Sequence, residues 1–162
     1  MSWREELNAV LEVRTYGKVA ETLPQLTNLD ERYPNVAEIN YQLAWTCDVL
    51  GRPADALPYY QKSVTLGLPP NEHSGALIGL AATLRALGQS AWAVDVLQSG
   101  KRQFPANREF DAFLALALHD EKRHAESVRL LVELLCDTSD DPAITAYQRA
   151  LRHAVAGLDD KK

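Results

Sequence analysis

The chain of 162 residues has few cysteines and no long apolar run. Its two cysteines, Cys47 and Cys136, lie far apart without metal-ligand spacing, so we expect both to be reduced thiols. No stretch approaches the roughly 18 uncharged apolar residues that a membrane-spanning helix needs. The first residues, Met1–Glu6, also lack the apolar core of a secretory signal. We therefore expect a cytoplasmic protein that does not enter a membrane.

A basic surface and a recognisable catalytic motif are also missing. The formal net charge of −5 weakens attraction to phosphate backbones, so we expect no nucleic-acid partner. The sequence has no glycine-rich phosphate loop and no local context for a nucleophilic triad. His119 and His124 are five residues apart, whereas a metal-binding helix places two histidines four apart and adds a third ligand. We predict no enzyme activity, no cofactor and no metal site.

The chain does contain a repeat. Four turn-like segments resemble one another, and apolar residues at helical spacing precede and follow each of them. The central residues of these turns are Gly17, Gly51, Gly88 and Lys122. They are separated by steps of 34, 37 and 34 residues. Since no segment alternates with period two, the pattern predicts nine helices, arranged as four antiparallel pairs and a final helix.

Residues typical of helix ends support this interpretation. Ser2 with Glu5, and Asn35 with Glu38, have the spacing of capping boxes. Asn71, Asn107 and Asp141 also fit as N-caps, and Pro142 stands at a first helical position. The final helix places Ile144, Tyr147, Leu151, Ala154 and Leu158 on one stripe, which we expect to cover the apolar edge of the fourth pair.

These residues resemble the tetratricopeptide repeat, in which units of 34 residues carry a small residue, a turn glycine, an alanine, an aromatic residue and a proline. The matching residues are Leu43-Ala44, Gly51, Ala56 and Tyr60 in the second unit, and Leu80-Ala81, Gly88, Ala93 and Pro105 in the third. The first unit departs from the pattern at Glu6 and Val10, and the fourth at Lys122 and Ser127. The chain is similar to small stand-alone bacterial members of this family.

The resemblance implies an all-α, right-handed superhelical solenoid of four helix-turn-helix units and a C-terminal capping helix. We expect one solenoid over residues 1–158. Its units span about 3–36, 37–70, 74–107 and 108–141, the capping helix spans 142–158, and the tail 159–162 is frayed.

The resemblance also implies a groove lined by the first helix of each unit. The predicted partner-binding residues are Leu7, Leu11, Glu38, Tyr41, Gln42, Trp45, Asp48, Ile78, Arg85, Phe113 and His119. Further residues at or beside groove positions are Arg4, Asn8, Arg14, Gly75, Ala82, Glu109, Ala112 and Leu116. A variant of the family clamps a terminal carboxylate with basic and amide residues on successive first helices. At the corresponding positions this chain has Leu7, Leu11, Gly75 and Gly79, so we expect no such clamp.

Tyr41 and Trp45 are the most informative groove residues. They are four residues apart and therefore share a helical face, and aromatic residues dominate binding hot spots. The alternative is that both belong to the core. Small residues at Gly75, Gly79 and Ala82 either leave room for a cleft opposite them or permit close helix packing.

The leading hypothesis is a non-catalytic adaptor that binds a peptide or partner helix in this groove. The groove residues favour an apolar segment, and Glu38 with Asp48 would suit a basic residue beside it. The alternative is a self-associating scaffold, a homodimer that uses exposed aromatic residues such as Trp92, although Trp92 also fits ordinary packing. An RNA-binding helical repeat is a third and more distant hypothesis, because the chain is acidic.

Overall fold

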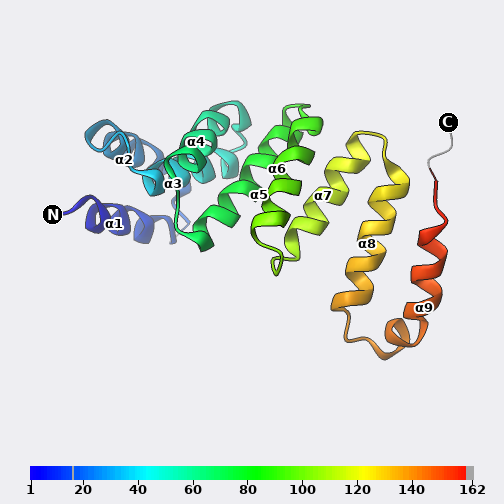
Figure 1. The fold of residues 1–162 in the computed structure, drawn as a ribbon. Coiled ribbons are helices and arrows are strands. Elements are labelled where there is room, and N and C mark those ends of the chain that lie inside the picture. The colour runs from blue at the N-terminus through cyan, green and yellow to red at the C-terminus, as the bar shows by residue number, and fades with distance from the viewer. Residues whose placement is uncertain (16, 160–162) are drawn as a thin grey trace. The chain divides into compact units, whose positions relative to one another are not determined.

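The computed structural model describes residues 1–15 and 17–159. Within this part of the chain it contains nine α-helices and no strand, which confirms the predicted all-α class (Figure 1). The helices are α1 (Trp3–Thr15), α2 (Val19–Arg32), α3 (Ala37–Val49), α4 (Pro53–Leu66), α5 (Pro70–Ala86), α6 (Ser90–Gln103), α7 (Glu109–Asp120), α8 (His124–Thr138) and α9 (Pro142–Ala156). Tyr16 and most of the predicted tail, residues 160–162, lie outside the described residues.

The four turns form at the predicted residues because each contains a residue in the left-handed region of backbone space. The φ angle is 82° at Gly17, 70° at Gly51, 73° at Gly88 and 64° at Lys122. Glycine adopts this conformation without steric cost, whereas lysine does not. The turn at Lys122 nevertheless has the same hydrogen bond as the turn at Gly51, donated across it by the following residue over 2.9 Å in both.

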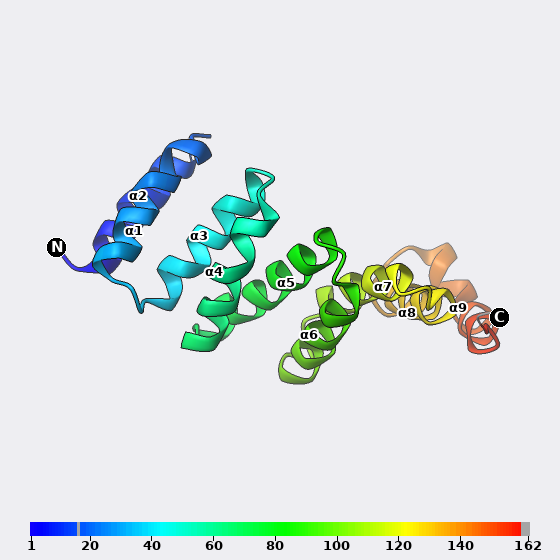
Figure 2. The same ribbon diagram turned by 90° about the horizontal axis from the view of Figure 1, so that it is seen from above.

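The chain divides into two compact units, residues 1–87 and 88–162, which are described separately. In the first unit each helix packs against its sequence neighbour, and α3 also contacts α5. Figures 1 and 2 show α1 and α2 side by side. The core cluster of α1, α2 and α3 consists of Leu7, Val10, Leu26, Leu29, Ile39 and Leu43. Their removal from water is the main contribution to the stability of this end of the unit.

Helix α5 begins earlier than predicted. It starts at Pro70 rather than near residue 74 and has 17 residues, against 13 in α3. The three additional residues of the 37-residue step therefore lengthen α5 instead of forming a loop. Pro70 stands in the first turn, where a helix needs no backbone N–H. The earlier start brings Glu72 into the helix.

Two of the five predicted helix caps are present. The Ser2 backbone N–H donates to Glu5 Oε2 over 2.7 Å, and the Asp141 carboxylate accepts from the backbone N–H groups of Ala143 and Ile144. The box at Asn35 is wrong, because α3 is preceded by Val36 and has no side-chain cap. The predicted N-caps Asn71 and Asn107 are also wrong, because α5 is preceded by Pro69 and α7 by Arg108, and neither helix has a side-chain cap.

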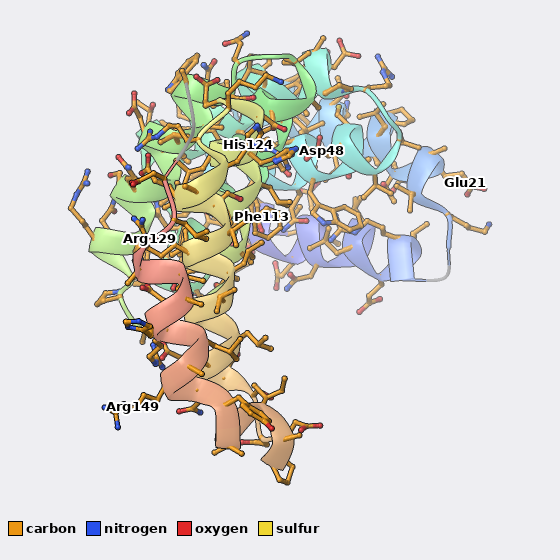
Figure 3. All side chains as sticks on the ribbon, turned by 90° about the vertical axis from the view of Figure 1, so that its right-hand side faces the viewer. Glu21, Asp48, Phe113, His124, Arg129 and Arg149 are labelled. Carbon is orange, nitrogen blue, oxygen red and sulfur yellow. The ribbon has the colours of Figure 1, made fainter. Side chains whose placement is uncertain are left out.

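In the second unit α6, α7, α8 and α9 pack in sequence order. Arg129 on α8 donates to the backbone carbonyls of Val155 and Leu158, where α8 and α9 run side by side (Figure 3). Val155 is buried against α8, whereas Tyr147 is 67% exposed. The predicted stripe is therefore wrong at Tyr147, Ala154 and Leu158, which are exposed, because the helix turns the Val155 side inward.

Candidate functional site: the surface of α1, α3 and α5

Side chains of three helices meet on one face of the first unit. We call the set Arg4, Arg14, Glu38, Tyr41, Trp45 and Glu72 the α1–α3–α5 surface. Arg4 and Arg14 come from α1, the next three residues from α3, and Glu72 from α5. Five of the six are half-buried, and Arg4 is exposed. They are therefore accessible enough to contact a ligand.

Arg14 and Trp45 form the aromatic end of this surface. The guanidinium carbon of Arg14 lies 4.1 Å from the centre of the Trp45 ring, a cation–π geometry. Burial lowers the pKa of Arg14, because removal from water penalises its charge. Its Nη1 atom is buried and has no hydrogen-bond partner among the described residues. This corner of the surface thus contains a buried donor that has no acceptor among the described residues, and a ligand reaches it only if the guanidinium group moves outward.

Tyr41 lies between the aromatic end and α5. Burial raises the pKa of its phenol, the charge of Glu72 raises it further, and Arg14 acts in the opposite direction. Its ring is 6.3 Å from that of Tyr60. Tyr41 and Trp45 are both half-buried, so neither of the two sequence interpretations, an exposed groove or a closed core, describes them fully.

Glu38 and Glu72 form the acidic end. Arg4 binds Glu38 over 3.0 Å, and the Glu38 side chain is 17% exposed. Burial raises the pKa of Glu72, and the neighbouring Glu38 charge raises it further, while Arg4 lowers it. Two carboxylates and one guanidinium leave this end with excess negative charge. Sequence reasoning missed Glu72 because the groove positions of the third unit were counted from about residue 74, which lies after it.

Asp48 does not face an open groove, contrary to the sequence prediction. Its carboxylate accepts a hydrogen bond from the Tyr60 hydroxyl over 3.1 Å and from the Thr83 hydroxyl over 3.1 Å. Burial, followed by the Asp48 charge, raises the pKa of Tyr60 far above its ordinary value. Asp48 therefore joins α3, α4 and α5 as an internal hydrogen-bond acceptor.

The assignment of Leu7 to the groove is also wrong. Leu7 is 5% exposed and belongs to the core cluster, and Leu11 packs partly buried against the same cluster. The reason lies in Glu6, which stands where the family has a large apolar residue. Glu6 stays near the surface and binds Arg32 through both oxygens, so α1 buries the Leu7 side instead.

The small residues of α5 permit close packing. A Cβ atom on Gly79 would collide with the Tyr60 ring, and one on Gly75 would lie 2.7 Å from the Tyr41 hydroxyl oxygen. The space beside these two glycines is thus occupied by the side chains of Tyr60 and Tyr41. Of the two interpretations of these glycines, close helix packing describes Gly79.

The other predicted groove residues are distributed over both units. Gln42, Ile78 and Arg85 are half-buried in the first unit, and Phe113 is half-buried on α7 in the second. His119 is exposed, and its Nδ1 atom lies 3.0 Å from Nδ1 of His124.

Trp92, the residue considered for self-association, is 43% exposed. No group of three or more His, Cys, Asp or Glu side chains converges within residues 1–15 and 17–159. In the same residues, no helix combines the length and apolar character needed to cross a membrane.

The repeat geometry agrees with a comparison by sequence. The model described as "Tetratrico peptide repeat" matches residues 37–158. The chain belongs to the tetratricopeptide repeat family. The fold of this family is generally a non-catalytic module for protein interaction. None of the curated proteins matches the sequence significantly.

Solved structures share the fold. The chain is similar to MamA 41-end from Desulfovibrio magneticus RS-1, with a TM-score of 0.75 and 19% identity over 95% of this chain and 89% of that one. A second crystal structure of MamA gives a TM-score of 0.72 and 18% identity over 90% and 86%. YrrB, described as a tetratricopeptide repeat protein with an unusual peptide-binding site, gives 0.71 and 15% over 93% and 76%. At these identities the likeness shows a tetratricopeptide-type solenoid fold.

Proposed function

We propose that the protein is a non-catalytic adaptor that binds a segment of another protein on the α1–α3–α5 surface. The observation that carries this proposal is the Arg14 guanidinium, stacked on Trp45 with a buried Nη1 that lacks an acceptor among the described residues. A buried donor without a partner costs about 1–3 kcal/mol. A ligand that draws the guanidinium group outward and supplies the acceptor removes this cost, which favours the bound state.

The chemistry of the surface defines the ligand. Tyr41 and Trp45 offer partly exposed aromatic area, which suits an apolar side chain. Arg14 suits an acidic group, because hydrogen bonds between ionised partners are roughly twice as strong as neutral ones. The acidic end, with Glu38 and Glu72, suits a basic residue. We therefore expect an apolar segment with an acidic group at one end and a basic residue at the other.

The basic residue in this proposal differs in position from the one expected from sequence. Asp48 is engaged by Tyr60 and Thr83, so it is unsuited to bind a ligand. Glu72 takes its place, since it lies beside Glu38 and its pKa is raised by burial and by that neighbour. YrrB has a peptide-binding site on a fold of the same type, which supports the adaptor role by analogy.

A double-mutant cycle tests the acidic contact. Peptides selected from a random library against the wild-type protein are the probes, and their Kd values are measured by fluorescence anisotropy. Arg14→Gln, and replacement of the peptide's acidic residue by its amide, should each weaken binding by ~10-fold, which is ~1.4 kcal/mol. The two changes together should weaken it little further, because each removes the same contact.

A matched control uses an exposed arginine of the second unit. Arg149→Gln on α9 should leave the Kd unchanged. The proposal is wrong if the selected peptides bind Arg14→Gln and Trp45→Ala as tightly as the wild type. Additive effects of the two changes in the cycle would show that the acidic group contacts another residue.

A further inference from the structure

Helix α8 carries a row of exposed apolar side chains. Val128, Leu131 and Leu135 are 46%, 41% and 43% exposed. Their spacing of three and four residues places them on one face of the helix. We call these three residues the α8 row. Large apolar residues gathered on one exposed face are typical of an interaction site.

The repeat itself shows what is unusual about the α8 row. Leu131 stands nine residues after its turn residue, as do Tyr60 and Leu97 after theirs. Tyr60 is 2% exposed and Leu97 is fully buried. In the first unit the Tyr60 ring is covered by α5, at Gly79. Leu131 thus occupies the repeat position of Tyr60 and Leu97. At those two residues the first helix of the next repeat unit covers the side chain.

The final helix leaves this row open because it packs on another side of α8. Its contacts are made by Arg129, which binds carbonyls near the end of α9, and by the Cys136 carbonyl, which accepts from Gln148. Arg129 and Cys136 lie roughly 100–200° around α8 from Leu131, at about 100° per residue. The capping expected of α9 is therefore incomplete.

The α8 row also lacks charge. The charged side chains of α8 are those of Glu126, Arg129, Glu133 and Asp137. At about 100° per residue, all four lie on the half of the helix opposite the row. Asp137 binds Arg108 and Arg152 there. A surface that covers the row must therefore be apolar and electrically neutral.

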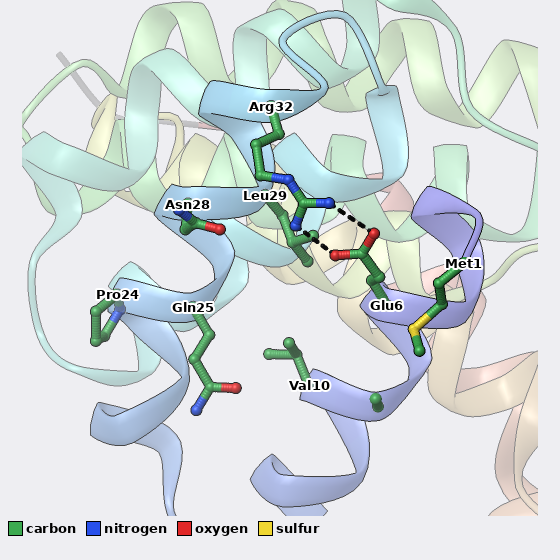
Figure 4. Close-up of a pocket in the computed structure, with 9 residues that line it drawn as sticks. Met1, Glu6, Val10, Pro24, Gln25, Asn28, Leu29 and Arg32 are labelled. Atoms are coloured by element: carbon green, nitrogen blue, oxygen red, sulfur yellow. Dashed lines mark hydrogen bonds and ion pairs between the residues drawn. The ribbon is translucent and has the colours of Figure 1, made fainter.

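The first unit contains a pocket with those properties. It has a volume of about 500 Å³ and lies between α1 and α2 (Figure 4). Its lining is apolar at Met1, Ala9, Val10, Pro24 and Leu29, and polar but uncharged at Gln25 and Asn28. The two charged lining residues, Glu6 and Arg32, neutralise each other through two hydrogen bonds. Only Val10 and Leu29 of this lining belong to the core cluster, so the pocket opens on a side of the helix pair outside that core.

We propose that the α8 row of one copy packs into the α1–α2 pocket of a second copy. The row is convex and uncharged, and the pocket is concave, apolar and internally neutralised. The contact would cover the Leu131 position with a helix pair of a second chain, as the following helix pair covers Tyr60 and Leu97 within one chain. It is a heterologous contact, because different surfaces of the two copies meet. It uses neither Trp92 nor the α1–α3–α5 surface, so it is independent of the proposed function.

Two complementary variants test this pairing. Leu131→Glu places a charge in the row and leaves the pocket intact, whereas Ala9→Arg fills the pocket and leaves the row intact. Each is measured by sedimentation equilibrium over a wide concentration series. We expect the wild-type mass to at least double above the 18.0 kDa of one chain as concentration rises, and each variant alone to stay at 18.0 kDa. An equimolar mixture of the two should reach twice that mass, since one intact row meets one intact pocket.

Controls separate this result from loss of folding and from other interfaces. Circular dichroism melting shows whether each variant folds, and Leu135→Lys replaces Leu131→Glu if the latter melts early. Ala91→Arg, an exposed site on α6, should associate like the wild type. The proposal is overturned if the wild type stays at 18.0 kDa, or if the mixture of folded variants does. It is equally overturned if Ala9→Arg alone still doubles its mass, since rows would then pair with rows.

Discussion

The aromatic ring of Tyr60 fills the space in which a side chain at Gly79 would stand. Tyr60 is 2% exposed, and its hydroxyl donates to Asp48 over 3.1 Å, so the ring is held from both ends. Because residue 79 has no side chain, α4 and α5 approach closely at this point. A small residue in a first helix of this protein thus marks a close contact between helices.

Replacing Gly79 by alanine should therefore destabilise the protein. The added methyl group collides with a buried ring, and overpacking of this kind costs ~1–3 kcal/mol. Alanine recovers up to ~1 kcal/mol through its higher helix propensity. We expect the free energy of unfolding, measured with urea, to fall by a net amount of up to ~2 kcal/mol, the difference between these terms.

Gly75→Ala on the same helix is the matched control. Its methyl group meets only the tip of the half-buried Tyr41 side chain, which can shift. Its stability should be equal to or greater than that of the wild type. A similar gain in both variants would show that the Tyr60 ring moves freely.

The turn at Lys122 predicts a stabilising substitution. Lysine at a φ of 64° carries a backbone cost of roughly 1–2 kcal/mol that glycine avoids. Lys122→Gly should therefore raise the free energy of unfolding by ~1 kcal/mol, seen as a higher urea midpoint. Gly51→Ala should have the opposite effect and lower the free energy of unfolding. A Cβ atom there meets nothing within 4 Å, so only the backbone is strained. An unchanged midpoint for both would mean that the turns relax to another conformation.

Glu72 predicts a dependence of stability on pH. Its pKa is raised above its ordinary value of 4.5, chiefly by burial and then by Glu38. A carboxyl group with a raised pKa stabilises the fold while protonated, and this stabilisation is lost as pH rises through the folded-state pKa. Glu72→Gln should therefore melt at a higher temperature than the wild type at pH 7.

The difference in melting temperature between Glu72→Gln and the wild type should shrink toward zero as the pH falls below 4.5. Both side chains at position 72 are then neutral. Glu12→Gln, at an exposed site on α1, serves as the control and should show no such trend. A constant difference for Glu72→Gln at all pH values would exclude ionisation as its cause.

The turns and the helices were predictable from sequence because each depends on local chemistry. A glycine recurring at near-constant spacing indicates a left-handed turn, and apolar spacing indicates a helix. Lys122 was identified only through its spacing, since its residue type alone argues against that turn. Family identity followed from the same repeat.

The residues that line the groove were less predictable, because they depend on which face each helix buries. One polar residue, Glu6, rotates the buried side of α1 toward Leu7 and invalidates the family position there. For a similar reason Asp48 is an internal hydrogen-bond acceptor, and Glu72 takes its predicted place as an acidic residue of the binding surface. Thr83 and Tyr60, from two other helices, capture Asp48, and an early start of α5 places Glu72 beside Glu38. Such contacts between distant segments cannot be derived from helical spacing within one segment.

The last prediction compares binding with stability for one aromatic residue. Trp45 is half-buried and stacks on Arg14, whereas Leu80 is 5% exposed in the core. Trp45→Ala should weaken peptide binding by ~2 kcal/mol or more, the usual scale of an aromatic hot spot. Leu80→Ala should instead lower the free energy of unfolding by ~2–5 kcal/mol, because it leaves a cavity.

The two measurements must be made on the same variants. Peptide Kd values come from anisotropy, and unfolding free energies from urea titration with far-UV circular dichroism. Trp92→Ala, at an exposed site in the second unit, controls for the general effect of removing a tryptophan and should change neither quantity much. If Trp45→Ala loses as much stability as Leu80→Ala, then Trp45 is a core residue. The α1–α3–α5 surface would then lack the aromatic contact on which the proposed ligand chemistry depends.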